Sequence, residues 1–150
     1  MALAKWIQNN KSKVNKNVQL LFTTYEEVGH GGASGIPLST KEMISVDMGA
    51  IGDDLSGTEE KVSICAKDSG GPYDYSLTKN LVNVAKNGNL DYVVDVFPYY
   101  GSDVEVTLRA GYDIKHGLIG PGVFASHGYE RTHIDGILNT LLLLIHYITK

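Results

Sequence analysis

Apolar side chains recur every three or four residues in three stretches of the chain, as on one face of an α-helix. The stretches span residues 1–10 and 77–87, and a last one from 132 onward. A further helix is predicted over residues 102–110 from its capping pattern and from Gly111, which would end it. Ser102 and Glu105 form the capping-box pattern of this helix, and Thr132 stands where the last helix would be capped. No capping residue precedes the first stretch, so we expect a helix whose beginning is missing, with a frayed terminus as the alternative.

Short β-prone runs separate these stretches and predict five strands. They are Val18–Tyr25, Met43–Met48, Lys61–Lys67, Tyr92–Phe97 and Ile114–Ile119. The first run is almost continuously apolar, which is typical of a strand covered on both faces, whereas the third alternates and predicts a half-buried strand. Gly120-Pro-Gly122 is expected to break the last strand. The pattern predicts an α/β fold with a mostly parallel or mixed sheet flanked by helices, whose ligands bind beyond the carboxyl ends of the strands.

Composition narrows the class of protein. The 150 residues are 43% apolar and 20% charged, which fits one globular domain over residues 1–150. A net charge of −4 argues against a nucleic-acid binder, and the single Cys65 excludes a disulfide framework or a cysteine-rich zinc module. The apolar stretch Ile137–Ile148 is too short to span a bilayer, and the first residues lack a signal-peptide pattern. We therefore expect a cytoplasmic protein that binds neither membranes nor nucleic acid.

Carboxylates follow two of the predicted strands. Glu26 and Glu27 come directly after the first, and Asp47 ends the second. Adjacent carboxylates repel each other unless a cation lies between them, so a metal ion is one explanation of the pair. One carboxylate would then be a ligand and the other a general base for water. A solvated pair at Glu26–Glu27, and an acid that accepts loop hydrogen bonds at Asp47, are the alternatives.

Two later segments carry further candidates. The loop Ser126–His133 contains His127 and His133, whose spacing allows at most one of them to be a metal ligand from this loop. A capping or surface histidine is the alternative. Asp103 begins a predicted helix, where the helix dipole favours a carboxylate, so a plain capping role is the alternative to a functional one.

Two other functions fit the pattern less well. The glycines between Gly29 and Gly35 are typical of a phosphate-binding loop, but no helical pattern follows them and Glu26–Glu27 would repel a pyrophosphate. A glycosidase needs two carboxyls that flank one bond, and neighbours on a strand point in different directions.

Taken together, these motifs resemble the co-catalytic metallo-aminopeptidases of the glutamyl and deblocking aminopeptidase family. The specific match is the run Phe22-Thr-Thr-Tyr-Glu-Glu-Val-Gly29, with weaker matches along most of the chain. The weaker matches are Gly32-Ala33, Val46-Asp47, Gly101-Ser-Asp103 and Ser126-His127 followed by Glu130.

The resemblance implies an aminopeptidase that removes N-terminal residues from peptides with two divalent metal ions, zinc or cobalt. By this resemblance Glu26 is the general base, and Glu27 and His127 are ligands of one metal ion. Asp47 is a ligand of the other metal ion, and Asp103 is a weaker candidate for contact with the substrate.

The chain departs from the family pattern at its beginning. The family's first metal-binding histidine, its bridging aspartate and an inserted dimerisation domain would precede Glu26, and the chain has no counterpart of them. We therefore expect a partial catalytic domain that binds metal weakly and is inactive in isolation. It should self-associate or require a complementing segment. A non-catalytic relative that keeps the fold is the alternative.

Overall fold

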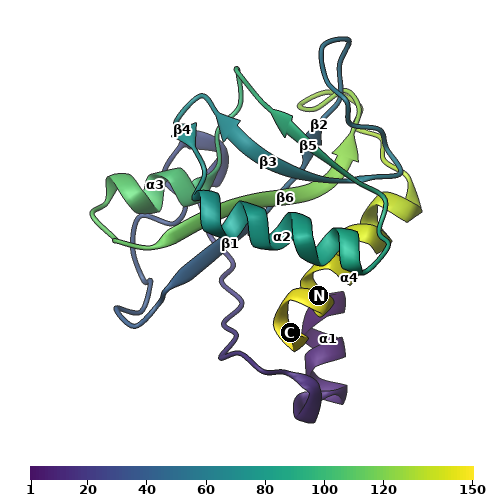
Figure 1. Ribbon diagram of the computed structural model, residues 1–150. Helices are drawn as coiled ribbons and strands as arrows, with labels where there is room; N and C mark the ends of the chain where they lie inside the picture. The colour runs from purple at the N-terminus through teal and green to yellow at the C-terminus, as the bar shows by residue number, and fades with distance from the viewer.

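The computed structural model describes residues 1–150 as a mixed β-sheet with helices packed on it (Figure 1). The helices are α1 (Ala2–Asn9), α2 (Tyr75–Asn87), α3 (Asp103–Arg109) and α4 (Ile134–Thr149), with 3₁₀ turns at Lys11–Lys13 and Glu26–Val28. The strands are β1 (Glu42–Val46), β2 (Gly49–Ala50), β3 (Val62–Asp68), β4 (Gly71–Pro72), β5 (Tyr92–Val96) and β6 (Lys115–Val123). No helix is long and apolar enough to cross a membrane.

The sheet combines parallel and antiparallel neighbours. β1 and β2 pair with β6 in parallel, and β5 pairs with β3 in parallel. β3 and β6 are antiparallel to each other, and β4 returns antiparallel to the end of β3. This arrangement confirms the predicted α/β fold with a mixed sheet flanked by helices.

The two faces of the sheet are covered by different elements. On one face, α2 and α4 pack their apolar stripes against Val62, Ile64 and Ile119, and α1 adds Leu3, Trp6 and Ile7 at the edge. A second apolar cluster joins Cys65, Tyr73, Phe97, Val104 and Leu118. Because this cluster covers the other side of β3, that strand is buried on both faces instead of half-buried as predicted.

The run Val18–Tyr25 is not a strand, contrary to the prediction. Residues 16–24 are extended but make no backbone hydrogen bond to any other part of the chain. A strand requires a neighbour at about 4.8 Å, and no strand of the sheet pairs with this segment. Its apolar side chains stay accessible, with Leu20, Leu21 and Phe22 at 40%, 41% and 72% exposure.

Three other local predictions differ from the structure. Gly120–Gly122 continues β6, because a Cβ at Gly120 or Gly122 would collide with the carbonyl of Asp47 or Thr58. Glycine thus permits close backbone approach here and does not break the strand. Ser102 begins α3 without a capping hydrogen bond from its side chain, and Thr132 donates to the Gly122 carbonyl while His133 caps α4.

Candidate functional site

Glu26 and Glu27 lie in a tight turn against the N-terminal end of α3. The turn is framed by Tyr25 at φ 61° and Gly29 at φ 78°, both in the left-handed region. Gly31 and Gly32, which follow the turn, lie against the backbone of Glu26 and Asp103. A Cβ at Gly31 would lie 3.0 Å from the Glu26 Cα, and a Cβ at Gly32 would lie 2.7 Å from the Asp103 carbonyl oxygen. The glycine-rich loop therefore brings the two glutamates onto α3, which no side chain at Gly32 would allow.

Helix α3 makes hydrogen bonds to the segments before and after this turn. Before the glutamates, the Thr23 hydroxyl donates to Asp103 Oδ2 at 2.9 Å, and the Ser45 hydroxyl of β1 donates to Oδ1 at 2.8 Å. After them, the Thr107 hydroxyl donates to the Gly32 carbonyl at 2.8 Å. Asp103 is only 9% exposed and Thr107 is fully buried. One face of one short helix thus fixes both flanks of Glu26–Glu27.

The late loop brings His127 beside the glutamate pair. His127 Nδ1 lies 3.9 Å from Glu27 Oε2, and both side chains are more than three-quarters exposed. The backbone of His127 is left-handed at φ 61°, and its N–H donates to Glu130 Oε1 at 3.1 Å. His133 instead uses Nδ1 to cap α4. Of the two histidines in the loop, only His127 therefore contacts the candidate site.

The carboxylates of the site repel one another, and this repulsion affects their pKa values. Burial raises the pKa of Glu26 above its ordinary value, and the charges of Asp47, Asp103 and Glu27 raise it further. Burial likewise raises the pKa of Asp47, although the nearby Tyr100 hydroxyl opposes the effect. A carboxylate with a raised pKa holds a proton more strongly than an ordinary glutamate does.

These donors do not complete a metal site within the 150 residues. Glu27 and His127 are close enough to share an ion, but no three histidine, cysteine or acidic side chains converge on one point. Protein zinc sites normally use at least three such ligands. Asp47 lies within electrostatic range of Glu26 without joining the Glu27–His127 pair. The metal-binding roles of Glu27, Asp47 and His127 therefore stay predictions.

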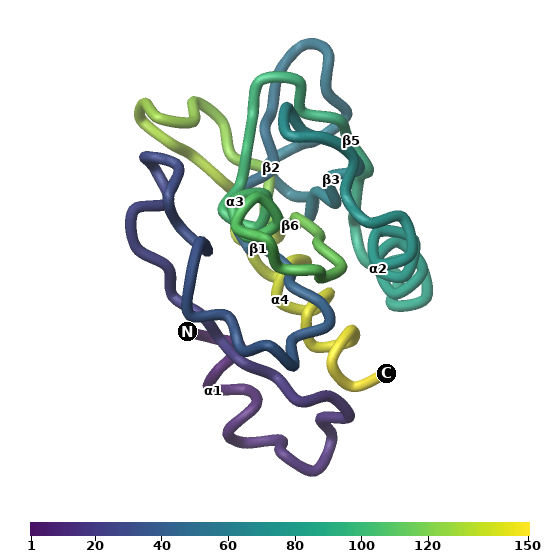
Figure 2. The backbone as a smooth tube through the Cα atoms, turned by 90° about the vertical axis from the view of Figure 1, so that its left-hand side faces the viewer, coloured from purple at the N-terminus to yellow at the C-terminus, as the bar shows by residue number.

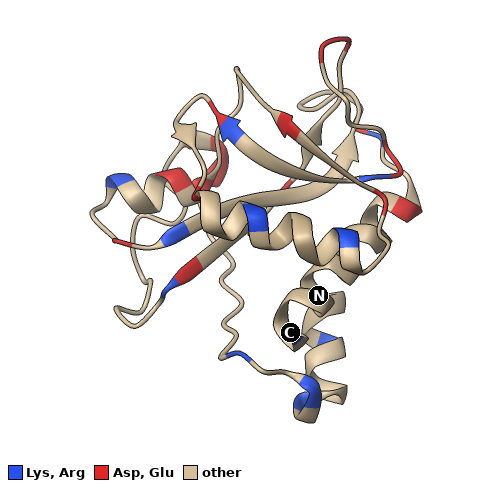
Figure 3. Ribbon diagram, viewed as in Figure 1, with Lys and Arg blue, Asp and Glu red and all other residues tan.

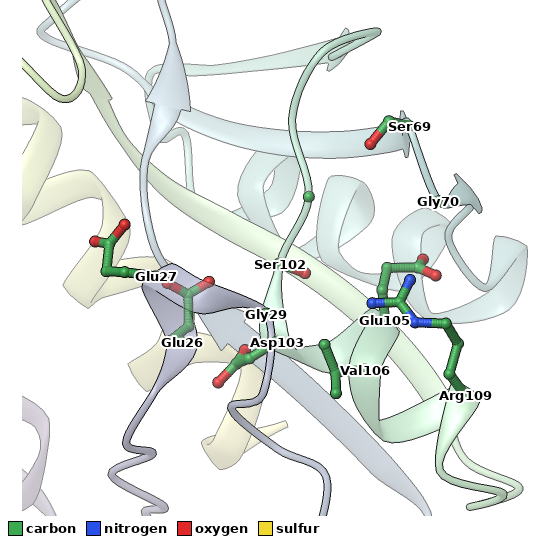
Figure 4. A pocket seen from close by; sticks show the side chains of 11 residues that line it. Glu26, Glu27, Gly29, Ser69, Gly70, Ser102, Asp103, Glu105, Val106 and Arg109 are labelled. Carbon is green, nitrogen blue, oxygen red and sulfur yellow. The ribbon is translucent and has the colours of Figure 1, made fainter.

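A polar pocket opens next to the glutamates, with a volume of about 370 Å³ (Figure 4). Glu26, Glu27 and Asp103 line one side, and Glu105 and Arg109 of α3 line the other, with Val106 as its single apolar residue. Elsewhere, Lys and Arg are spread over α1, α2 and β3 (Figure 3). Four of the pocket's lining side chains are carboxylates, Glu26, Glu27, Asp103 and Glu105, and Arg109 is the one cation among them.

The sequence interpretation missed Glu105 as a pocket residue. Its carboxylate lies 3.3 Å from His116 Nε2, and burial raises its pKa. A signal was present, because Glu105 and Arg109 have the i, i+4 spacing of neighbours on one helix face. No sequence pattern pointed to His116. It lies on β6, and only the pairing of β6 within the sheet brings it close to Glu105 of α3.

A family model described as M42 glutamyl aminopeptidase matches residues 1–143. The chain belongs to this family. It is also 47% identical over 142 residues to the putative aminopeptidase YhfE of Bacillus subtilis (strain 168), a match that covers 95% of this chain and 41% of YhfE. The resemblance inferred from the run Phe22–Gly29 and the weaker motifs is therefore confirmed, and the chain spans less than half the length of YhfE.

Solved structures show the same fold. PhTET1-12s, described as a dodecamer, matches with a TM-score of 0.72 and 19% identity over 85% of this chain and 40% of its own. The aminopeptidase APDkam598 of the archaeon Desulfurococcus kamchatkensis matches with a TM-score of 0.63 and 17% identity, over 72% of this chain and 34% of its own. The M42 chain thus has the fold of part of these proteins.

Proposed function

We propose that this chain is the part of a metallo-aminopeptidase catalytic domain that carries the general base. The observation that supports it best is the turn in which Glu26 and Glu27 face one pocket, with His127 at 3.9 Å from Glu27. Family membership supplies the reaction class, which is removal of N-terminal residues from peptides. Glu26 accepts the proton of the attacking water, for which its raised pKa is suited.

In this proposal Glu27 and His127 are two ligands of one divalent ion, and Asp47 is a ligand of a second. Zinc or cobalt suits such mixed imidazole and carboxylate donors. Because only two donors converge here, we assign no catalytic step to a metal ion held by these 150 residues alone. Asp103 lines the pocket, but both of its oxygens accept hydroxyl hydrogen bonds, so we assign it to holding the turn.

The isolated 150-residue chain should accordingly hydrolyse peptides little or not at all, even with zinc or cobalt added. Further donors would come from a complementing segment. The alternative is a non-catalytic relative that keeps the fold, which the exposed and incomplete Glu27–His127 pair would also suit. The proposal and its alternative differ in one expectation. Only the proposal expects Glu26 to act as general base once the rest of a catalytic domain is supplied.

A chimera tests this difference. The corresponding residues of YhfE are replaced by this chain, and hydrolysis of a panel of aminoacyl anilides is measured with zinc or cobalt, with intact YhfE as reference. We expect turnover that Glu26→Gln abolishes while bound metal is retained. Glu60→Gln, a surface change outside the site, should leave turnover unchanged. A folded chimera that hydrolyses nothing would favour the non-catalytic alternative.

Self-association is a further part of the proposal. PhTET1-12s is described as a dodecamer, and the Pyrococcus horikoshii TET1 peptidase as assembling into a tetrahedron or a large octahedral shell. The present chain exposes several apolar side chains along residues 18–25 and on β1, and such surfaces promote association. Light scattering at increasing concentration should show a rising mass, and a constant monomer mass would contradict it.

A further inference from the structure

The pocket between the Glu26–Val28 turn and α3 has two different walls. Glu26 and Glu27 form one wall, and Glu105 and Arg109 of α3 form the other (Figure 4). Figure 2 shows α3 almost end-on, with the chain that leads to β1 running beside it. The volume of about 370 Å³ lies near the lower end of the usual range for small-molecule pockets. The pocket therefore has room for one side chain or a small molecule, but not for an extended peptide.

Glu105 is a buried carboxylate that lacks a hydrogen-bond donor. The residue is only 7% exposed, and its Oε1 atom makes no hydrogen bond. His116 Nε2 lies 3.3 Å from this oxygen, but it makes no hydrogen bond either. Gly70 lies over the other oxygen, because a Cβ at Gly70 would be 2.8 Å from Oε2. A buried carboxylate without its hydrogen bonds is costly, so a donor that enters the pocket would stabilise Glu105.

Buried groups beneath the pocket surround Glu105. The ring of Tyr73 lies 5.2 Å from the ring of His116, and the Tyr73 hydroxyl donates to Asp68 Oδ2 at 2.6 Å. Burial raises the pKa of Glu105, the charge of Asp68 raises it further, and the charges of His116 and Arg109 oppose the effect. A further cation beside Glu105 would lower this pKa, because it favours the charged form of the carboxylate.

The charges around the pocket favour a cationic ligand. Four carboxylates line it, and Arg109 is the single cation among them. Asp103 already accepts two hydroxyl hydrogen bonds, and Glu26 and Glu27 have roles in the proposed catalysis. Glu105 is therefore the carboxylate available to recognise a substrate. An acidic side chain would be repelled here, and an apolar one would leave Glu105 without a donor.

We propose that this pocket binds the side chain of the N-terminal residue to be removed, that this residue is lysine or arginine, and that Glu105 selects it. The inference rests on the proposed function, which places the bond to be cleaved beside Glu26. Glu105 Oε1 accepts a hydrogen bond from the ammonium or guanidinium group of the substrate. Arg109 lies on the same wall, and its charge reduces the preference for a cation. Glu105 contacts no reacting atom, so it determines specificity and not the chemical step.

Two amino-acid amides test the pocket without any turnover. L-lysinamide has the terminal ammonium group that L-norleucinamide lacks, and the two share the α-amine and the aliphatic chain. Titration of the 150-residue chain followed by NMR should show at least tenfold tighter binding of lysinamide at low salt. The amides of Gly70 and α3 should shift. Glu105→Gln should bring the two affinities within twofold, and Arg109→Gln should increase the preference for lysinamide.

Two results of these titrations would overturn the proposal. One is equal binding of the two amides by the unchanged chain. The other is equal weakening of both by Glu105→Gln, which would show that Glu105 contacts the shared α-amine instead of the side chain. Glu60→Gln makes the same chemical change at an exposed position outside the pocket, and it should alter neither affinity.

The chimera with YhfE separates this inference from the proposed function. In the chimera, Glu105→Gln should lower kcat/KM for a lysyl anilide at least tenfold and leave kcat/KM for a leucyl anilide within twofold. An unchanged ratio of the two values would overturn the inference while leaving the proposed function intact. A chimera that hydrolyses nothing, together with a chain that still prefers lysinamide, would refute the proposed function but not the cation-binding pocket.

Discussion

Removing the Asp103 carboxylate should release the turn that holds Glu26 and Glu27. Asp103→Ala deletes two hydroxyl-to-carboxylate hydrogen bonds, one to Thr23 and one to Ser45. Hydrogen bonds to charged groups contribute about 1.5–3 kcal/mol each, and partly exposed hydroxyls recover some of this with water. We therefore expect a gross loss near the lower end, about 3 kcal/mol for the pair.

One effect opposes this loss. The Asp103 charge raises the pKa of both Glu26 and Asp47, so its removal relieves repulsion between the carboxylates. Relief of that kind is worth about 1 kcal/mol at most for groups that are partly exposed to solvent. The lost hydrogen bonds therefore outweigh it, and we expect Asp103→Ala to destabilise the fold by about 2–3 kcal/mol net. Asp103→Asn, which can still accept one hydroxyl and donate to the other, should cost less.

Two measurements check the prediction. Urea unfolding gives the loss of stability, and ¹⁵N relaxation of residues 23–32 reports whether the turn becomes mobile. Asp95→Ala is the matched control, because Asp95 is equally buried but accepts from the Ser56 N–H in another loop. It should lower stability without mobilising residues 23–32. Equal order of this turn in both variants would refute this role of Asp103.

Two further predictions concern buried titratable groups. Burial raises the pKa of the Cys65 thiol to about 12, so it should react with a thiol reagent only at the rate of unfolding, and fast labelling of the native chain would contradict this. Burial and Asp68 raise the pKa of Glu105 above 4.5, against the opposing charges of His116 and Arg109. The folded state then binds the proton more tightly than the unfolded state, so stability from this group is present below about pH 4.5 and is lost as pH rises through the raised pKa. Urea unfolding at several pH values should show this decrease of the unfolding free energy with rising pH, and Glu105→Gln should remove it. The same pH dependence in Glu105→Gln would refute the prediction.

The local parts of the fold were predictable from the sequence. The stripe Leu77, Leu81, Val84 and Ala85 predicted α2, and β1, β3 and β5 lie where their β-prone runs are. Glu26, Glu27 and His127 also follow from the sequence as candidates, because of their positions after apolar runs and the family motif they match. Such features depend on spacing between near neighbours, which the order of residues states directly.

Tertiary structure decided which of these residues meet and which segments are paired. Val18–Tyr25 has the composition of a strand, but pairing needs a neighbour, and that neighbour is a property of the packed sheet. Thr23 and Asp103 are 80 positions apart in sequence, and Thr107 and Gly32 are 75 apart, yet each pair is joined by a hydrogen bond. No local pattern encodes these contacts, because α3 and the turn are brought together by the packing of the sheet that carries both.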